Sequence, residues 1–474
     1  KIMCNSALEV WCVFNPKGIW GNLISILLFR TPLISNQLSA QWSQVGTDLG
    51  VTSSQSTISV AFKPSTNEPH VAYYSYTDNT FKIQKFNGSS WSQVGDDLGV
   101  ARFQRVISIA FNPNTNEPYV AFQSIEDDAF EIHKFDGTTW SQVGADLGYS
   151  SSFDEISIIF NPSTNEPYVA YSDGADSAFK IQKFNGTTWT QVGSDLSVAK
   201  NQSYWSSSTI AIAFNPSTNE PYVAYRDFPS STYTIQKFDN TSWTQVGANL
   251  DYASDGKGIS IAFNPSTNKP YVAYPSFDDY AFKIQKFDGT SWAQVGTVIG
   301  YAGRGLGVSL AFNPSTKEPY VAYANPLDYA FKIHKFNGTS WAQVGVDLGF
   351  TSFDEGISLA FNPSSNEPYV AYSDKQEKTF KIEKFGDILS LPDLKNTSIN
   401  MKVYPNPTIG NAQVAFDESA FGVQYILFDL VGKEVLRGNI NKQNEIINLE
   451  NLTKGSYLLR IEGSYSQGLK LIKL

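Results

Sequence analysis

The stretch ISIIFNPSTNEPYVAYSD occupies residues 156–173, and near copies of it occur six more times in this 474-residue chain. Each copy holds two runs of alternating side chains, ISIIF and PYVAYSD here, that are rich in β-branched and aromatic residues. Such runs are typical of β-strands, and the NPSTNE segment between them consists of turn-forming residues. The stretch therefore predicts an antiparallel hairpin that occurs seven times.

Two further landmarks accompany each copy. A run similar to FKIQKF follows the hairpin, and a Trp-x-Gln-Val-Gly motif closes the unit. The motif begins at Trp42, Trp91, Trp140, Trp189, Trp243, Trp292 and Trp341. The period is 49 residues, with one spacing of 54 between the fourth and fifth motifs. We name the four predicted strands of a unit A (ISIIF), B (PYVAYSD), C (FKIQKF) and D (the Trp strand).

A fixed period of this length, with four strand signals and no helical pattern, predicts an all-β fold: a seven-bladed β-propeller with four-stranded blades. The blades loosely resemble kelch-type and galactose-oxidase-like repeats. One Trp motif precedes the first A strand, and none follows Phe385. We therefore expect residues 41–46 to pair with residues 380–385 and to close the ring, which also protects an open sheet edge. The equivalent Trp and Tyr side chains are predicted to pack between blades.

Asn-Gly or Asp-Gly dipeptides connect the C and D strands of most units, as in Asn87-Gly88 and Asp136-Gly137. They are the strongest short hairpin signal, because both residues of the corresponding two-residue turn need a positive φ. The fourth unit departs from this pattern with Asp239-Asn240, which the same turn should tolerate less well.

The chain has a net charge of −10, and the repeats are its acidic part. Residues 1–40 contribute +2, residues 386–400 contribute −1 and residues 401–474 contribute +1, which leaves −12 for residues 41–385. An acidic body of this size repels phosphate backbones, so we expect no nucleic-acid partner. Cys4 and Cys12 are the two cysteines, so the repeats contain no disulfide and no thiolate-bound metal. We expect no cofactor and no metal site, and we expect a monomer.

Residues 1–40 are predicted to be a secretory leader whose start is uncertain. A short apolar region precedes Ser39-Ala40, which resembles a signal-peptidase site. A degenerate half-repeat is the alternative, since VFNP at 13–16 matches AFKP at 61–64. No apolar stretch reaches the roughly 20 residues of a membrane span, so no transmembrane segment is expected.

Differences between the copies point to one face of the disc. Alternating strand directions place the A–B and C–D turns, which vary little, on one face, and the B–C and D–A segments, which hold nearly all the variation, on the other. Loops on a rigid scaffold are the usual place for function, so the second face is the predicted binding face. The candidate ligand-binding residues are Arg102, Asp127, Asp128, Asp154, Tyr204, Trp205, Arg226, Asp278, Asp279, Arg304 and Asp354.

Two features of this face carry the site hypotheses. The five extra residues of unit four bring Tyr204 and Trp205, which could stack on a sugar ring or anchor a protein, or could fold onto a neighbouring loop. Acidic pairs such as Asp278-Asp279 could act as acid and base on a glycoside, could bind Ca²⁺, or could form a solvated acidic rim. None of the three histidines stands beside a repeated Ser, Cys or metal-ligand partner, so the sequence predicts no catalytic residue.

Residues 401–474 have no repeat and follow a polar linker at 386–400. The opening Tyr404-Pro405-Asn406-Pro407, the FDLVGKEV run at 428–435, the stretch at 452–459 and the basic, apolar end together resemble the C-terminal sorting domain of the type IX secretion system. Short alternating strands predict a small β-sandwich here. The resemblance implies export through a leader and an outer-membrane translocon, and a place outside a Gram-negative cell or on its surface.

Three functions remain open at this point. The first is a secreted or surface-attached binding module for an extracellular carbohydrate or protein, acting through the variable loops. The second is a polysaccharide hydrolase or lyase that acts at the same face. The third is a structural surface protein without a ligand.

Overall fold

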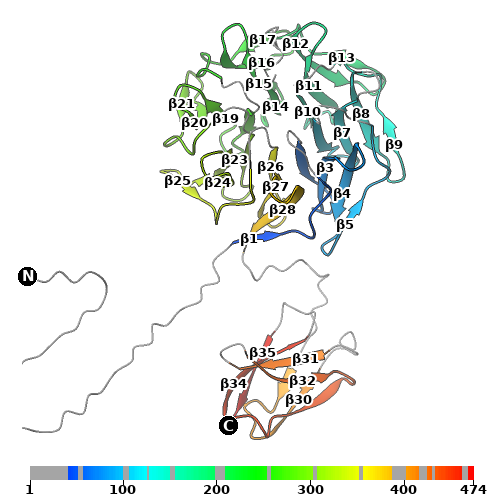
Figure 1. The fold of residues 1–474 in the computed structure, drawn as a ribbon, viewed down its shortest axis with the longest axis vertical. Coiled ribbons are helices and arrows are strands. Elements are labelled where there is room, and N and C mark those ends of the chain that lie inside the picture. The colour runs from blue at the N-terminus through cyan, green and yellow to red at the C-terminus, as the bar shows by residue number, and fades with distance from the viewer. Residues whose placement is uncertain are drawn as a thin grey trace, which may run out of the picture. The chain divides into compact units, whose positions relative to one another are not determined.

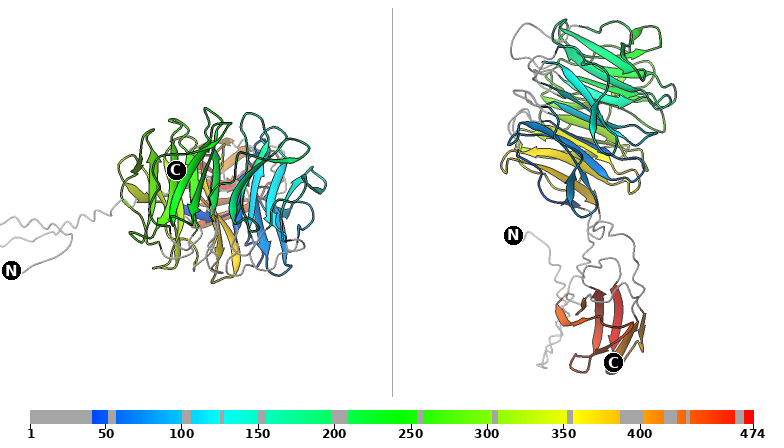
Figure 2. Two further views of the ribbon diagram at one scale, coloured as in Figure 1. Left: turned by 90° about the horizontal axis from the view of Figure 1, so that it is seen from above. Right: turned by 90° about the vertical axis from the view of Figure 1, so that its right-hand side faces the viewer.

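The computed structural model describes residues 41–51, 57–99, 106–124, 128–149, 155–197, 209–253, 258–302, 307–351, 356–386, 402–415, 424–429, 433–461 and 468–474. Every regular element in these residues is a β-strand. Seven antiparallel four-stranded sheets radiate from a common axis, which confirms the seven-bladed propeller (Figures 1 and 2). Two further sheets belong to the C-terminal part of the chain.

Each blade runs from its inner strand to its outer strand in the predicted order A, B, C and D. Blades 1 to 3 consist of β2 (Ile58–Phe62), β3 (Pro69–Ser75), β4 (Thr80–Phe86) and β5 (Trp91–Gln93); β6 (Ile107–Phe111), β7 (Pro118–Gln123), β8 (Phe130–Phe135) and β9 (Trp140–Gln142); and β10 (Ile156–Phe160), β11 (Pro167–Asp173), β12 (Ala178–Phe184) and β13 (Trp189–Gln191).

Blades 4 to 6 repeat this order. Their strands are β14 (Ile210–Phe214), β15 (Pro221–Asp227), β16 (Thr232–Phe238) and β17 (Trp243–Gln245); β18 (Ser260–Phe263), β19 (Pro270–Ser276), β20 (Ala281–Phe287) and β21 (Trp292–Gln294); and β22 (Val308–Phe312), β23 (Pro319–Asn325), β24 (Ala330–Phe336) and β25 (Trp341–Gln343).

Blade 7 contains the closure of the ring. Its A, B and C strands are β26 (Ile357–Phe361), β27 (Pro368–Asp374) and β28 (Thr379–Gly386), and its outer strand is β1 (Gln41–Gln44). β1 pairs antiparallel with β28, with Trp42 opposite Phe385 and Gln41 opposite Gly386 (Figure 1). The predicted closure is confirmed, and β28 extends one residue beyond the predicted end of the propeller.

The seven Trp side chains join neighbouring blades. Each indole Nε1 donates a hydrogen bond to the Val carbonyl of the Trp-x-Gln-Val-Gly motif in the preceding blade. The bonds are Trp91 to Val45, Trp140 to Val94, Trp189 to Val143, Trp243 to Val192, Trp292 to Val246, Trp341 to Val295 and Trp42 to Val344, at 2.6–2.7 Å. The last bond belongs to the closing strand, so the ring of bonds is complete. The prediction that these Trp side chains pack between blades is confirmed.

The glycine of the same motif fits this contact. Gly345 has a φ of +70°, and a Cβ at this position would lie 2.6 Å from Cδ1 of Trp42. Only glycine combines this backbone conformation with so close an approach by the next blade.

Rings also join the blades closer to the axis. The aromatic residue at the start of each C strand contacts the fifth residue of the next B strand. The pairs are Phe380–Tyr73, Phe81–Phe122, Phe130–Tyr171, Phe179–Tyr225, Tyr233–Tyr274, Phe282–Tyr323 and Phe331–Tyr372, with centroids 4.7–5.5 Å apart. The core is therefore a series of clusters between adjacent blades rather than one central cluster.

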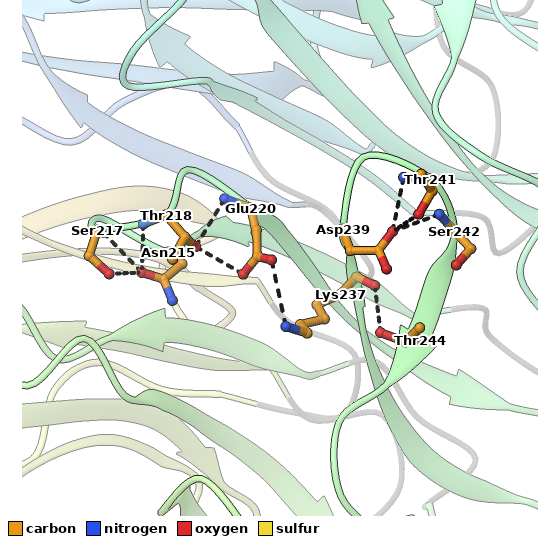
Figure 3. A network of polar contacts seen from close by, with 9 residues as sticks. All are labelled: Asn215, Ser217, Thr218, Glu220, Lys237, Asp239, Thr241, Ser242 and Thr244. Atoms are coloured by element: carbon orange, nitrogen blue, oxygen red, sulfur yellow. Dashed lines mark hydrogen bonds and ion pairs between the residues drawn. The ribbon is translucent and has the colours of Figure 1, made fainter.

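The A–B and C–D turns are held by side chains of their own residues, as blade 4 shows (Figure 3). Asn215 Oδ1 accepts hydrogen bonds from the backbone N–H of Ser217 (2.9 Å) and Thr218 (3.3 Å). Asp239 Oδ1 accepts from the N–H of Thr241 (2.9 Å) and Ser242 (2.8 Å). These local bonds explain why the two turns vary so little between blades.

The expected two-residue C–D turn is wrong. Phe86 pairs with Trp91, so the loop has four residues, and Gly88 has a positive φ (97°) whereas Asn87 is not among the residues with one. The Asn87 side chain instead accepts the N–H of the two residues at the end of the loop, at 2.9 Å each. The same geometry suits blade 4, because Asn240 takes the positive φ (75°).

The C-terminal residues form two antiparallel sheets. One consists of β29 (Lys402–Tyr404), β30 (Asn411–Ala415) and β33 (Asn444–Asn448), and the other of β32 (Glu434–Asn439), β31 (Gln424–Phe428), β34 (Gly455–Ile461) and β35 (Gly468–Lys473). Side chains from both sheets form one buried cluster, which includes Val414, Leu427, Ile447 and Leu471. The predicted small β-sandwich is confirmed.

Candidate ligand-binding face

The B–C turns and D–A segments lie at the same end of the blades, where backbone hydrogen bonds join them. Thr351 N donates to Tyr329 O in the turn of its own blade, and Lys375 N in the next blade donates to Phe350 O, both at 2.9 Å. Equivalent bonds join Ala302 N to Tyr280 O, Phe277 N to Tyr252 O, Gly174 N to Tyr149 O and Tyr76 N to Val51 O. We call this end of the propeller the variable face.

Acidic side chains of the variable face gather around lysines. In blade 6, Lys332 Nζ lies 2.7 Å from Asp328 Oδ2 and 2.9 Å from Asp347 Oδ2. Four other blades hold the first Lys of their C strand in the same way. These clusters are Lys82 with Asp78 and Asp97, Lys180 with Asp173 and Asp176, Lys283 with Asp251 and Asp279, and Lys381 with Asp374 and Glu377.

Hydrogen bonds and neighbouring charges in these clusters favour the charged forms of Lys332 and Asp78. Burial alone would lower the pKa of Lys332, but hydrogen bonds and the charges of Asp328 and Asp347 raise it above its ordinary value. Hydrogen bonds from Lys82 and Ser75 lower the pKa of the Asp78 carboxyl. A glycosidase pair needs one carboxyl whose pKa is raised beside one that stays ionised. The lowered pKa of Asp78 does not suit the acid of such a pair.

Exposed aromatic rings lie in blades 5 and 6 and in the D–A segment of blade 4. We call these residues the aromatic row: Tyr252 (56% exposed), Phe277 (39%), Tyr280 (45%), Tyr301 (36%), Tyr329 (49%) and Phe350 (37%). They lie in the B–C turns and D–A segments, so they belong to the variable face. Large aromatic side chains are usually buried, and a group of exposed ones marks an interaction site.

Two pairs within the row have the same construction. In blade 5, the rings of Tyr280 and Tyr301 are parallel to within 9° with centroids 6.2 Å apart. In blade 6, the rings of Tyr329 and Phe350 are parallel to within 10° with centroids 5.4 Å apart. We call these pairs the blade 5 platform and the blade 6 platform. Phe277 extends the first one, because its ring centroid lies 5.0 Å from that of Tyr280.

The turn residues of the platforms have an unfavourable backbone conformation. Tyr280 (φ 51°) and Tyr329 (φ 55°) lie in the left-handed region, at the turn position that Asn79 holds in blade 1. Asn tolerates this region, whereas a bulky residue there costs about 1–2 kcal/mol. The turn itself therefore does not favour tyrosine, and such costs often accompany binding sites.

The predicted acidic site residues that the structure describes take separate roles. Asp279 belongs to the Lys283 cluster, and Asp278 Oδ2 accepts a hydrogen bond from the backbone N–H of Tyr252 at 3.3 Å. Both lie beside the blade 5 platform. Asp128 lies in blade 2, which holds neither platform, and occupies the left-handed turn position there (φ 52°).

Arg226 lies inside blade 4 rather than on the surface. It is 5% exposed, and its Cζ lies 4.4 Å above the centroid of the Phe228 ring. A buried guanidinium stacked on a ring suits a structural role in this blade. The other predicted site residues lie outside the described residues: Arg102, Asp127, Asp154, Tyr204, Trp205, Arg304 and Asp354.

The histidines occupy positions of the repeated scaffold. Burial lowers the pKa of His70 to about 4, and its ring packs edge-on against Phe111 with centroids 4.9 Å apart. Tyr119 makes the equivalent contact with Phe160 in the next pair of blades. Among the described residues, no group of His, Cys, Asp and Glu side chains could hold a metal ion.

The site residues predicted from the sequence are charged residues together with Tyr204 and Trp205, and none of them belongs to the aromatic row. A signal for it exists in the comparison of copies. The position two residues after the Leu or Ile that follows the D strand is Val in three copies and aromatic in four. The aromatic residues are Tyr149 and, in three consecutive copies, Tyr252, Tyr301 and Phe350. A platform forms where this position and the left-handed turn position of the same blade both hold an aromatic residue.

The C-terminal part of the chain identifies the route of export. Its residues 402–473 match the family described as secretion system C-terminal sorting domain. These residues are a type IX sorting domain. The protein is therefore secreted or attached to the surface of a Gram-negative bacterium. No helix that could cross a membrane is found in the part of the chain that the structure describes.

The propeller is similar to solved structures at low identity. They include a fucose-specific lectin from Aleuria aurantia (13% identity, TM-score 0.45, covering 63% of this chain and 97% of that chain) and AofleA from Arthrobotrys oligospora (11%, 0.43, 65% and 92%). A β-propeller domain of Cps50 (Swd1) from Myceliophteria thermophila also matches (12%, 0.45, 72% and 99%). These likenesses concern the fold alone. No curated protein matches the sequence.

Proposed function

We propose that the propeller is a carbohydrate-binding module of a secreted or surface-attached protein, and that its site is the aromatic row on the variable face. The observation that carries this proposal is the repeated pair of parallel, exposed rings in blades 5 and 6. The negative face of an aromatic ring attracts the C–H groups on the apolar face of a sugar. Rings held in place before binding also lose little freedom when the ligand binds.

The surroundings of the row favour a sugar over a protein partner. Asp251, Asp278 and Asp279 adjoin the blade 5 platform, and Asp328 and Asp347 adjoin the blade 6 platform. Charged residues are depleted in the centre of protein interfaces. Carboxylates beside exposed rings instead supply acceptors for the hydroxyl groups that surround the apolar face of a sugar.

Affinity electrophoresis in gels that contain soluble polysaccharides tests the proposal. We expect at least one polysaccharide of the panel to retard the protein. The double variant Tyr301→Ala/Phe350→Ala should abolish this retardation, because it removes one ring from each platform. Tyr149→Ala is the matched control: Tyr149 holds the same repeat position and is 47% exposed, but the turn position of its blade is Asp128. Unchanged retardation of the double variant would overturn the proposal.

A second variant separates loss of the site from loss of the fold. Tyr280→Asn places the residue of blade 1 at the left-handed turn position, so it should raise the melting temperature while it weakens binding. Variants with damaged folding would show the opposite change in melting temperature. Phe350→Tyr keeps an aromatic ring and should retain binding.

A further inference from the structure

The two platforms have equivalent places in adjacent blades. Ala302 N donates to Tyr280 O in blade 5 (2.8 Å), and Thr351 N donates to Tyr329 O in blade 6 (2.9 Å). The second ring of each platform immediately precedes this donor. Because equivalent backbone hydrogen bonds fix both platforms, the rings have equivalent positions within blades 5 and 6.

Further exposed apolar side chains accompany the platforms in blades 5 and 6 and in the segment that leads from blade 4 to blade 5. Leu327, in the B–C turn of blade 6, is 69% exposed, and Tyr252 and Phe277 extend the row toward blade 4. At the left-handed turn position, blade 4 has Ser231 and blade 7 has Lys378. Among the described residues, ring pairs at these two positions therefore occur in blades 5 and 6 rather than in all seven blades.

The described charged residues beside the row are mostly carboxylates. Among the described residues, the clusters there contain Asp251, Asp279, Asp328 and Asp347 with two lysines, and Asp278 adds another carboxylate. Lys332 is already held by two carboxylates at 2.7 Å and 2.9 Å. An anionic ligand would therefore meet net repulsion and no uncommitted ammonium group in these clusters.

From these observations we infer that the platforms are consecutive subsites for a single linear, uncharged polysaccharide chain. The inference rests on the proposed function and specifies its ligand. A chain that covers both platforms gains from the second contact without a second loss of translational freedom, so affinity should rise steeply with chain length. Uronic-acid and sulfated polymers should be excluded.

The test has two arms, and both use the full chain. In the first, gels contain either neutral polymers (β-glucan, xylan, glucomannan) or anionic ones (alginate, polygalacturonate, chondroitin sulfate). We expect retardation by a neutral polymer and none by the anionic polymers. Stronger retardation by an anionic polymer, suppressed by salt, would overturn the assignment of an uncharged ligand while leaving carbohydrate binding intact.

The second arm uses calorimetry with the disaccharide and hexasaccharide of the polymer that retards the protein. The hexasaccharide should bind at least about tenfold more tightly than the disaccharide. Either Tyr301→Ala or Phe350→Ala alone should lower the hexasaccharide affinity to about that of the disaccharide and halve the number of disaccharide sites. Tyr149→Ala should change neither value.

Equal affinities for the two oligosaccharides would show independent sites and would overturn the inference but not the proposed function. A hexasaccharide affinity that survives both single variants would place the chain elsewhere and would also overturn it. Absence of retardation by every polymer would contradict the proposed function, and the inference with it.

Discussion

Glu383 replaces a glutamine that other blades carry in the middle of the C strand. In blade 3, Gln182 Nε2 donates to the Tyr171 hydroxyl at 2.9 Å. In blade 7 the direction is reversed, and the Tyr372 hydroxyl donates to Glu383 Oε1 at 2.6 Å. Burial raises the pKa of Glu383 above its ordinary value of 4.5, although the bond from Tyr372 acts against this shift. The closing blade thus has a carboxyl group where four blades have glutamine and two have histidine.

Glu383→Gln should stabilise the protein at neutral pH. Because the folded pKa is raised, the glutamic acid contributes stability that is fully present below pH 4.5 and is lost as the pH rises through the folded pKa. The melting temperature of the variant should exceed that of the wild type by roughly 1–2 °C at pH 7 and by less at pH 4, as measured by circular dichroism. Gln285→Glu in blade 5 is the matched control and should be destabilising in the same pH window. A wild type that is the more stable form at pH 7 would contradict this account.

At the residue scale, repeated residues were predictable and exceptional ones were not. The seven Trp residues share one environment, so their period alone indicates contacts between blades. Tyr280 and Tyr329 could not be recognised, because nothing in the local sequence shows that their turn position is left-handed. The Asn-Gly turns were predicted wrongly for a related reason: the Asn87 side chain replaces a second positive φ with hydrogen bonds to the loop.

Glycines in two turns of blade 6 separate backbone strain from contact between blades. Gly338 has a φ of +94° and no atom within 4 Å of a Cβ added there, whereas an added Cβ at Gly345 (φ +70°) would overlap Trp42. Gly338→Ala should cost about 1 kcal/mol through strain alone, and Gly345→Ala about 3 kcal/mol or more. Chemical denaturation measures both values. Equal costs would show that the Trp ring moves aside freely.

Removal of residues 41–46 tests the closing strand. The deletion exposes the edge of β28 and removes the Trp42 indole that donates to Val344 O at 2.7 Å. We expect a lower and broader thermal transition, because blade 7 loses its outer strand. Trp189→Phe removes one equivalent bond in the middle of the chain and should lower the transition without broadening it. An unchanged transition in the deletion variant would show that the ring is stable without its fourth strand in blade 7.

At the scale of the element, the strands and their order followed from the sequence because each strand alternates with a period of two and is bounded by turns. The ion pairs of the candidate site did not follow. Asp251 and Lys283 are 32 positions apart in the chain and meet only because the D–A segment of blade 4 reaches blade 5. The acidic pair at 278–279 was therefore considered as a unit, although its two carboxylates have different partners in the structure.

On the whole-molecule scale, the sorting domain should act as a folded unit. Truncation after residue 400 should leave the propeller folded but retained in the periplasm, as detected by immunoblotting of cell fractions. Leu471→Asp should have the same effect, because Leu471 is fully buried in the core of the sorting domain. Tyr149→Ala is the control with normal export. Secretion of the Leu471→Asp variant would show that export requires the sequence of the tail and not its fold.

The architecture of the whole molecule was the most predictable level, since a period of 49 residues admits few folds and the sorting domain has its own sequence signature. Function was the least predictable. The variable face was predicted to be the binding face because nearly all the variation among copies lies on it, and this stays a prediction. The binding residues predicted from charge do not belong to the aromatic row. Only an exposed aromatic ring can bind a ligand, and the alternation of residues along the predicted strands does not show which rings are exposed.

The first strand of the propeller has its partner at the far end of the repeats, since Gln41 lies opposite Gly386. Blade 7 can consequently be completed only after the last repeat has been synthesised, and until then the outer edge of β28 has no partner strand. Pairing of the first strand with the last is therefore the final step in completing the disc, whatever the order in which the other six blades form.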